Sequence, residues 1–339
     1  MIWTDAEGCR VRLADGRELL DLTGGFGVAA LGHRNPHILA AWAEQRVVHA
    51  LGDLGEAEAT HALREALPLP ARFGVSGEDA VEIGLRTALL ATGKPGIVAF
   101  EGAYHGLGLA ALAATGLERF REPFRAWLPG PVHRFAYGED PGPLPVDAGC
   151  VIVEPIQGRS GCVVPPDGFL ETLRRRCDEA GALLVCDEVF CGLGRTGVLW
   201  RSGDLADVLL TGKALGGGLP LSAALFRNGL ERVWEWGWPD DLYTHTHAGN
   251  PLACAAALVL LDALPRLLGR VAAAGERFAE AGWQGAGLFR ARRGDAQAAF
   301  DRGVLVVPAG DDGSLIQAVP PLTISDAELD EAFEKLAPV

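Results

Sequence analysis

The sequence has 339 residues, of which 49% are hydrophobic and 22% charged, enough for one sizeable globular unit or two lobes. The 30 Lys and Arg against 44 Asp and Glu give a net charge of −14, which disfavours partners such as nucleic acid and anionic membranes. The seven cysteines, an odd number, fit a reduced interior better than a disulfide framework, and their spacing does not suggest a metal site. The acidic start lacks a secretory signal, and the longest apolar run, 252–261, is too short to span a membrane. We therefore expect a cytoplasmic protein.

Short apolar runs alternate with longer helical patterns along the first 250 residues. A β-hairpin is expected over residues 9–21, and a helix follows Ser76 to about residue 91. Strands are predicted over residues 97–100, 151–153, 182–186, 208–210 and 221–226, with an amphipathic helix over 168–180. This alternation predicts an α/β fold with a mostly parallel central sheet.

The pattern changes beyond residue 251. An Ala/Leu-rich helix over 252–268 leads to a second, Ala-rich helix, a short strand over 304–307, a turn over 309–313 and a closing helix from Asp326. These elements predict a smaller C-terminal α+β lobe.

One glycine pattern suggests a nucleotide site but fails in its context. CDEVFCGLGRTG contains Gly192, Gly194 and Gly197 in a G-x-G-x-x-G spacing directly after a predicted strand. A dinucleotide-binding turn must open a helix, and an acidic residue should follow about 20 residues later. Here the next strand comes too soon for a crossover helix, and Asp187 precedes the glycines. A nicotinamide-dependent dehydrogenase is therefore disfavoured.

Ligands collect at the carboxyl ends of parallel strands, so the residues that follow each strand are candidates for chemistry. They are Glu101, Glu154, Asp187 and Lys213. In TGKALGGGLP the order does not fit a P-loop, because Ala214 follows Lys213. A lysine partly desolvated in such a turn has a lowered pKa and a nucleophilic amine, although a lone lysine is more often a solvated loop residue.

Together Lys213 and Asp187 match the needs of pyridoxal phosphate (PLP). The lysine would form the Schiff base, and a buried aspartate would keep the pyridine nitrogen protonated. A phosphate would need the N–H groups that open the helix at Ser76-Gly77-Glu78, with the Glu78 carboxylate turned away. An ordinary helix cap at Ser76 is the alternative explanation for that stretch.

Motifs spread over nearly the whole chain resemble the class III aminotransferases, PLP enzymes of fold type I that include ornithine and 4-aminobutyrate aminotransferases. The motifs are LLDLTGGFGVAALGHRNP, SGEDAVE, FEGAYHG, VEPIQGRSG, CDEVFCGLGRTG, TGKALGGGLP, THAGNPLACAAA and LVVPAGDDGSLIQAVPPLTIS. The resemblance implies residues 1–35 as the N-terminal segment of a small domain, 36–250 as a large PLP-binding domain and 251–339 as the C-terminal small domain.

The resemblance also implies a role for each matched site residue. Lys213 would form the internal aldimine, Asp187 would bind the pyridine nitrogen, and Val189 would pack under the ring. On the opposite face Tyr104 would stack, with His105 close by, while the backbone of Gly77 and Glu78 would hold the phosphate. Thr246 would reach the phosphate of a neighbouring subunit, which implies a homodimer with a shared active site.

The implied reaction moves an amino group from an ω-amine or (ω-)amino acid to a 2-oxo acid through Lys213. Three positions depart from the better-studied members of the family. Arg159 stands where they have a glutamate, Gln317 where they have the arginine that binds the substrate carboxylate, and Phe190 where a glutamine contacts the cofactor. Arg159 and Gln317 are therefore the candidate substrate-binding residues, although Arg159 also fits a solvated loop arginine.

Two alternatives to a transaminase stay open from the sequence alone. A catalytically impaired, PLP-binding family member is one, because family members usually carry an N-terminal arm ahead of the first hairpin, and we expect looser closure over the substrate without it. Another PLP reaction on the same fold, such as decarboxylation or aminomutation, is the second.

Overall fold

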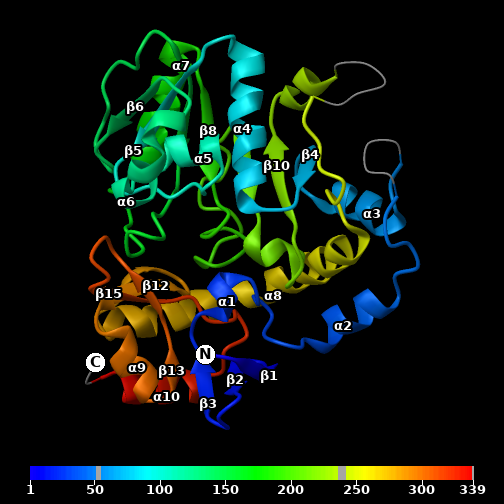
Figure 1. Cartoon of the computed structure of the whole chain (residues 1–339), viewed down its shortest axis with the longest axis vertical. Coiled ribbons are helices and arrows are strands. Elements are labelled where there is room, and N and C mark those ends of the chain that lie inside the picture. Colours follow the sequence, from blue (N-terminus) through cyan, green and yellow to red (C-terminus); the bar gives the residue numbers. More distant parts are fainter. Residues whose placement is uncertain (51–54, 236–241, 338–339) are drawn as a thin grey trace.

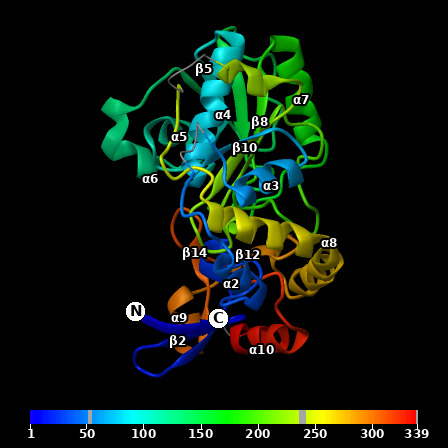
Figure 2. The ribbon, with the colours of Figure 1, turned by 90° about the vertical axis from the view of Figure 1, so that its right-hand side faces the viewer.

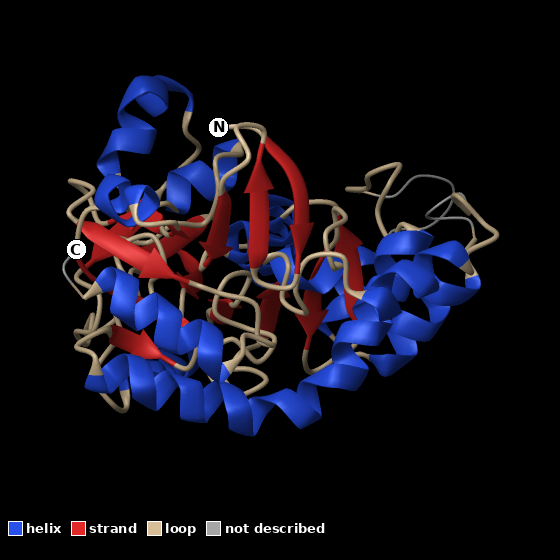
Figure 3. Cartoon of the chain, turned by 90° about the horizontal axis from the view of Figure 1, so that it is seen from below, coloured by secondary structure: helices blue, strands red, loops and turns tan. Residues whose placement is uncertain are grey.

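The computed structural model describes residues 1–50, 55–235 and 242–337. Figure 1 shows a larger upper part built around a central sheet and a smaller lower part that contains both termini. Seen from below, helices flank the strands on several sides (Figure 3). The fold is therefore of the α/β class.

The central sheet has seven strands in the order β4-β10-β9-β8-β7-β5-β6. Their bounds are β4 Ala71–Gly74, β10 Ser222–Phe226, β9 Val208–Thr211, β8 Leu183–Asp187, β7 Ala148–Val153, β5 Gly96–Phe100 and β6 Val132–Phe135. The run from β9 to β6 is parallel, while β10 is antiparallel to both β9 and β4. This confirms the prediction of a mostly parallel sheet, although β4 and β6 were not predicted.

Helices cover both faces of this sheet. On one face α4 (Gly77–Thr92) packs with Ile152, Val185 and Leu210, and on the other α7 (Phe169–Ala180) packs with alternate residues of the same strands, such as Val151 and Leu184. Figure 2 shows the sheet between these two helices. Because parallel strands are buried on both faces, every residue of β7 is buried.

Two smaller sheets form the lower part. One has the order β1 (Trp3–Glu7), β2 (Arg10–Leu13), β3 (Glu18–Asp21) and β13 (Val304–Leu305), so that the first and last parts of the chain share a sheet. The other has the order β11 (Gln284–Ala286), β12 (Phe289–Arg293), β15 (Leu315–Ala318) and β14 (Val307–Ala309). The strand predicted over 304–307 is thus divided between two sheets.

The long helix α8 (Pro251–Glu280) corrects one prediction, because a single 30-residue helix replaces the two expected. Pro265 lacks a helical N–H, yet apolar residues on both sides of it are buried, among them Leu260, Leu264 and Phe278. By length and composition alone it is the one described helix that could cross a membrane. Here it packs against α2 (Pro36–Ala43) and α3 (Glu58–Ala66) and lies between the upper and lower parts (Figures 1 and 2).

The remaining helices are short, apart from the closing helix. They are α1 (Gly24–Gly27), α5 (Leu109–Ala114), α6 (Glu118–Arg121), η1 (Glu122–Trp127), η2 (Lys213–Gly216), η3 (Leu230–Trp234), α9 (Ala296–Asp301) and α10 (Asp326–Leu336). The domain ranges 1–35, 36–250 and 251–339 stay a prediction, because α8 packs against elements of the large range. Residues 51–54, 236–241 and 338–339 of these ranges lie outside the described part of the chain.

Candidate active site

A cavity of about 480 Å³ lies where β7, β8 and β9 end. Glu154 follows β7, Asp187 is the last residue of β8, and Lys213 comes two residues after β9. The lining residues are Phe26, Ser76, Gly77, Glu78, Tyr104, His105, Gly106, Phe120, Glu154, Arg159, Asp187, Val189, Phe190 and Lys213. The cavity therefore joins most of the residues that the sequence points to.

Lys213 begins the 3₁₀ turn η2 with a φ of 43°, a backbone conformation that non-glycine residues seldom adopt. Its side chain is partly buried, and Nζ lies 4.2 Å from the centroid of the Phe190 ring. Burial lowers the pKa of Lys213, while the charge of Asp187 opposes this effect. The amine is therefore more easily deprotonated than a surface lysine, as a nucleophile or a base requires.

Asp187 is 5% exposed and is held by two donors. The backbone N–H of Val189 donates to Oδ1 at 3.1 Å, and His105 Nδ1 lies 2.8 Å from Oδ2. Nε2 of the buried His105 has no hydrogen-bond partner among the described residues. The contacts with Val189 and His105 fix the orientation of the Asp187 carboxylate at the end of its strand.

Glu154 is a site residue to which the sequence motifs assigned no role. It is 5% exposed, and its two carboxylate oxygens accept hydrogen bonds from the backbone N–H groups of Tyr104 (2.9 Å) and Gly158 (3.2 Å). Burial raises the pKa of Glu154 to about 7, with His105 opposing the shift. Its place directly after a buried strand made it a candidate in the sequence, but no motif gave it a function.

The first turn of α4 forms another wall of the cavity. Ser76 caps the helix reciprocally with Asp79, so that the expected N-cap is present and also faces the cavity. The Glu78 carboxylate accepts hydrogen bonds from the N–H groups of Leu107 (3.1 Å) and Gly108 (2.9 Å), away from the first-turn N–H groups of its own helix. Ser76 binds the N–H groups of Asp79 and Ala80, whereas those of Gly77 and Glu78 have no partner among the described residues and suit an anion.

Gly77 lies close to Val189, another residue of the cavity lining. A Cβ added to Gly77 would lie 2.7 Å from Val189 Cγ1, so only glycine fits between the start of α4 and Val189. Tyr104 stands in another wall, with its ring 5.4 Å from that of Phe120 in a T-shaped contact. A flat ring bound between Val189 and Tyr104 would therefore meet an aliphatic and an aromatic surface.

Two predicted residues do not line this cavity. Thr246 is exposed in the turn before α8 and lies outside the cavity of its own chain. Gln317 is fully buried in β15, where its amide donates to the Gly158 carbonyl (3.2 Å) and contacts Cys162 Sγ (3.0 Å). Arg159, in contrast, lines the cavity from a partly buried position.

The GLGRTG segment is a series of turns, with Gly194 and Gly197 at φ values of 80° and 88°. The glycines open no helix. A dinucleotide-binding turn requires that helix, so the structure agrees with the rejection of this motif.

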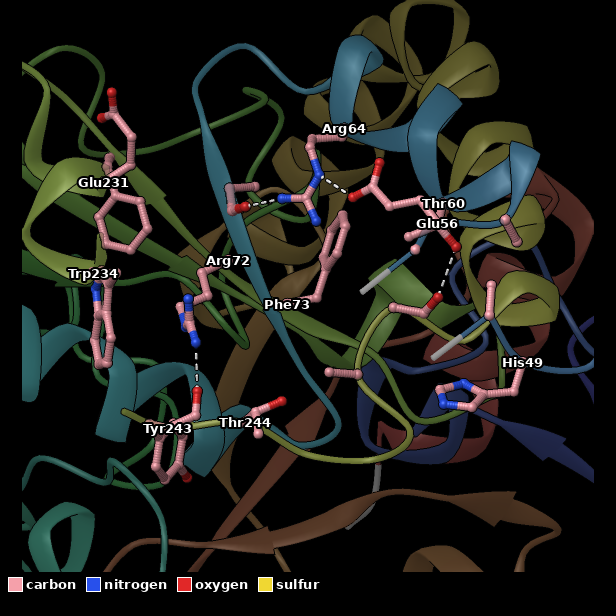
Figure 4. Close-up of a pocket in the computed structure, with 17 residues that line it drawn as sticks. His49, Glu56, Thr60, Arg64, Arg72, Phe73, Glu231, Trp234, Tyr243 and Thr244 are labelled. Atoms are coloured by element: carbon pink, nitrogen blue, oxygen red, sulfur yellow. Dashed lines mark hydrogen bonds and ion pairs between the residues drawn. The ribbon is translucent and has the colours of Figure 1, made fainter. Parts of the chain in front are cut away.

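A second cavity, of about 490 Å³, lies beside α3 and β4 (Figure 4). Its polar groups bind one another: Arg64 Nε donates to Glu56 (2.7 Å), and the Thr60 hydroxyl donates to the Gly249 carbonyl (2.8 Å). The Arg72 guanidinium likewise donates to the Tyr243 carbonyl at 2.5 Å. None of the predicted site residues lines it.

Comparisons with known proteins place this architecture in a family. The model of the aminotransferase class-III family matches residues 1–143 and 145–281. An acetylornithine aminotransferase from Methanopyrus kandleri is 38% identical, over 98% of this chain and 92% of its own length. A putrescine aminotransferase from Pectobacterium atrosepticum is 35% identical, over 91% of this chain and 76% of its own.

Solved structures agree with the sequence relatives. The chain superposes on an ornithine aminotransferase from Toxoplasma gondii with a TM-score of 0.89 and 26% identity, covering 98% of this chain and 88% of that one. An amine transaminase from an uncultivated Pseudomonas species, in its PLP-bound form, gives a TM-score of 0.91 and 26% identity, covering 99% and 94%. The fold is fold type I of the PLP enzymes. The chain belongs to the class III aminotransferases, and it is a PLP-dependent transaminase.

Proposed function

We propose that the cavity around Lys213 is where PLP binds and where the amino group is transferred. The observation that carries this proposal is the joint placement of Lys213 and Asp187 at the ends of neighbouring parallel strands, in one cavity with the anion-binding start of α4. A lysine, a fixed carboxylate and a phosphate-binding helix end are the three groups that PLP requires.

The surrounding residues fit this cofactor. Gly77 and Glu78 would hold the phosphate through their N–H groups, because the Glu78 carboxylate is bound elsewhere. Val189 and Tyr104 would cover the two faces of the ring. Asp187 would pair with the pyridine nitrogen, and His105 would keep its carboxylate in place.

Bound PLP supplies an electron sink that stabilises negative charge on the substrate carbon. The protein residues supply orientation and proton transfer. Lys213 Nζ, with its lowered pKa, would accept a proton from the substrate carbon and return it on the cofactor side. Asp187 Oδ would hold a proton on the ring nitrogen, and the aromatic rings of Tyr104 and Phe120 would exclude water from one side.

The substrates that we propose are an ω-amine or (ω-)amino acid as donor and a 2-oxo acid as acceptor. The names of the two curated relatives, one acting on acetylornithine and the other on putrescine, support a donor with a terminal amine. A requirement for a 2-oxo acid in every further turnover would separate transamination from decarboxylation or aminomutation, which need no second substrate.

We further propose a cytoplasmic homodimer whose subunits complete each other's sites through Thr246. The exposed position of Thr246, outside the cavity of its own chain, supports a contact with a neighbouring subunit. A dimer mass in sedimentation, together with weaker PLP binding by Thr246→Val, is the expected result. A monomer that binds PLP fully would contradict this assembly.

The central test is an absorption spectrum of the protein with PLP, for wild type and Lys213→Ala, before and after addition of amino donors. We expect a visible band that requires Lys213 and that a suitable donor bleaches, with recovery on addition of a 2-oxo acid. If wild type and Lys213→Ala give the same spectrum, the assignment of Lys213 is wrong.

A further inference from the structure

We propose that Arg159 binds a carboxylate at the far end of the amino donor, so that the enzyme selects ω-amino acids over diamines and simple alkylamines. This inference rests on the proposed transamination at Lys213. It assigns to the same cavity a chemical class of donor that the two curated relatives, named for acetylornithine and putrescine, leave open.

Arg159 lacks an anionic partner in the described part of the chain. Within the described residues its guanidinium forms no ion pair and no hydrogen bond; its contact is with the face of Tyr104, 5.8 Å from the ring centroid. Two arginines of α6 and η1, by comparison, are paired, since Arg119 binds Asp311 (3.2 Å) and Arg125 binds Glu118. A partly buried guanidinium offers a planar set of donors that matches a carboxylate, so a free one in a cavity wall indicates a ligand site.

Each carboxylate of the cavity already accepts hydrogen bonds from the protein, although Glu78 does so through Oε2 alone. Glu78 and Glu154 accept backbone N–H groups, and Asp187 accepts from Val189 and His105. The distal ammonium of a diamine would therefore meet the positive charge of Arg159. A distal carboxylate would meet a free partner, so the charges favour an amino acid.

A contact with the smaller, lower part of the molecule helps to fix the position of Arg159. Its backbone carbonyl accepts a hydrogen bond from the N–H of Gly310 at 3.0 Å, which ties the loop after β7 to the turn after β14. Phe26 and Phe120 also line the cavity, and Phe26 is 52% exposed. These rings offer an apolar surface to the methylene chain between the two ends of the donor.

The cavity also couples Arg159 to the reacting amine. Burial is the main cause of the lowered pKa of Lys213, and the positive charge of Arg159 adds to it. Lys213 and Arg159 therefore face the same cavity, where each would contact one end of a bound ω-amino acid.

The test compares donors of matched chain length on the PLP-loaded enzyme. The donors are 5-aminopentanoate, 1,4-diaminobutane and butylamine, and the readouts are bleaching of the cofactor band and kcat/KM with a 2-oxo acid. The variants are Arg159→Gln, Arg159→Lys, which keeps the charge but loses the planar fork, and Arg125→Gln as a control arginine, which pairs with Glu118 and lies outside the cavity lining.

We expect wild type to prefer the aminocarboxylate. Arg159→Gln should lower the ratio of kcat/KM for aminocarboxylate over alkylamine by roughly 10- to 100-fold, mainly through KM, as for the loss of a charge-assisted bond. The ratio for Arg159→Lys should lie between those of wild type and Arg159→Gln, and Arg125→Gln should keep the wild-type ratio.

A wild-type preference for the diamine, or an equal effect of Arg159→Gln on all three donors, would overturn the inference while the transaminase stands. If no donor bleaches the wild-type band, the proposed function fails first and the inference falls with it.

Discussion

The buried carboxylate of Glu154 should make the stability of the protein depend on pH. Its oxygens accept two backbone N–H groups, and it is 5% exposed. Burial raises the pKa of Glu154 to about 7. An exposed glutamate titrates near 4.3, so the folded and unfolded states hold this proton over different pH ranges.

The sign and size of the effect follow from this difference. Between about pH 4.3 and 7 the folded state keeps a proton that the unfolded state loses, so the free energy of unfolding falls as the pH rises through this window. Each pKa unit corresponds to about 1.36 kcal/mol, which gives a loss of roughly 4 kcal/mol over the whole window, of which roughly 3 kcal/mol falls between about pH 5 and about pH 8. Glu154→Gln removes the titration and keeps an oxygen that can accept a backbone N–H.

Urea unfolding of the cofactor-free protein at about pH 5 and about pH 8 measures this difference. We expect Glu154→Gln to be stabilised relative to wild type by roughly 3 kcal/mol more at the higher pH than at the lower. Glu101→Gln is the matched control, because Glu101 also follows a strand of the sheet but is exposed. A wild-type-to-variant difference that is the same at both pH values would refute the reasoning.

Three further substitutions test the proposed cofactor site. Asp187→Ala should lower turnover by several orders of magnitude with an unchanged circular dichroism spectrum, because the ring nitrogen loses its partner; near-normal rates would contradict the assignment. Glu78→Gln should tighten PLP binding by roughly 3- to 10-fold in a fluorescence titration, because it removes a negative charge near the phosphate; weaker binding would place the phosphate elsewhere. Gly77→Ala should weaken PLP binding, since its Cβ would lie 2.7 Å from Val189 Cγ1. In a Val189→Ala background, which lacks that Cγ1, Gly77→Ala should cost much less binding; the same loss in both backgrounds would show that the clash is not the cause.

The grouping of residues in the candidate site could be predicted from sequence because their position follows from a general rule. Parallel strands end at one edge of a sheet, so Asp187 and Lys213, each at the end of an apolar run, had to lie close together. The helix start at Ser76 was equally visible, because its capping residues are local. The same rule made Glu154 a candidate, because it follows an apolar run, but only the structure shows that its side chain is buried.

Other features depend on contacts between distant parts of the chain. Phe26, in a left-handed conformation with a φ of 60°, and Phe120 line the cavity, although the sequence motifs assigned neither of them a role in the site. The continuity of α8 through Pro265 depends on apolar burial on both sides, which local propensity does not report. Gln317 matched the family position of a substrate residue, yet its amide is bound by Gly158 and Cys162 in the interior.

Phe190 shows how a departure from the family is built into the packing. Its ring lies 4.2 Å from Lys213 Nζ and 4.8 Å from the ring of Phe289. A Cβ on Gly158 would lie 2.7 Å from the Phe190 ring, and one on Gly27 would lie 3.2 Å from it. Glycine at both positions therefore makes room for the aromatic ring. Because β12, the loop after β7 and the N-terminal segment all contact this ring, packing in the smaller sheets helps to set the position of the reactive amine.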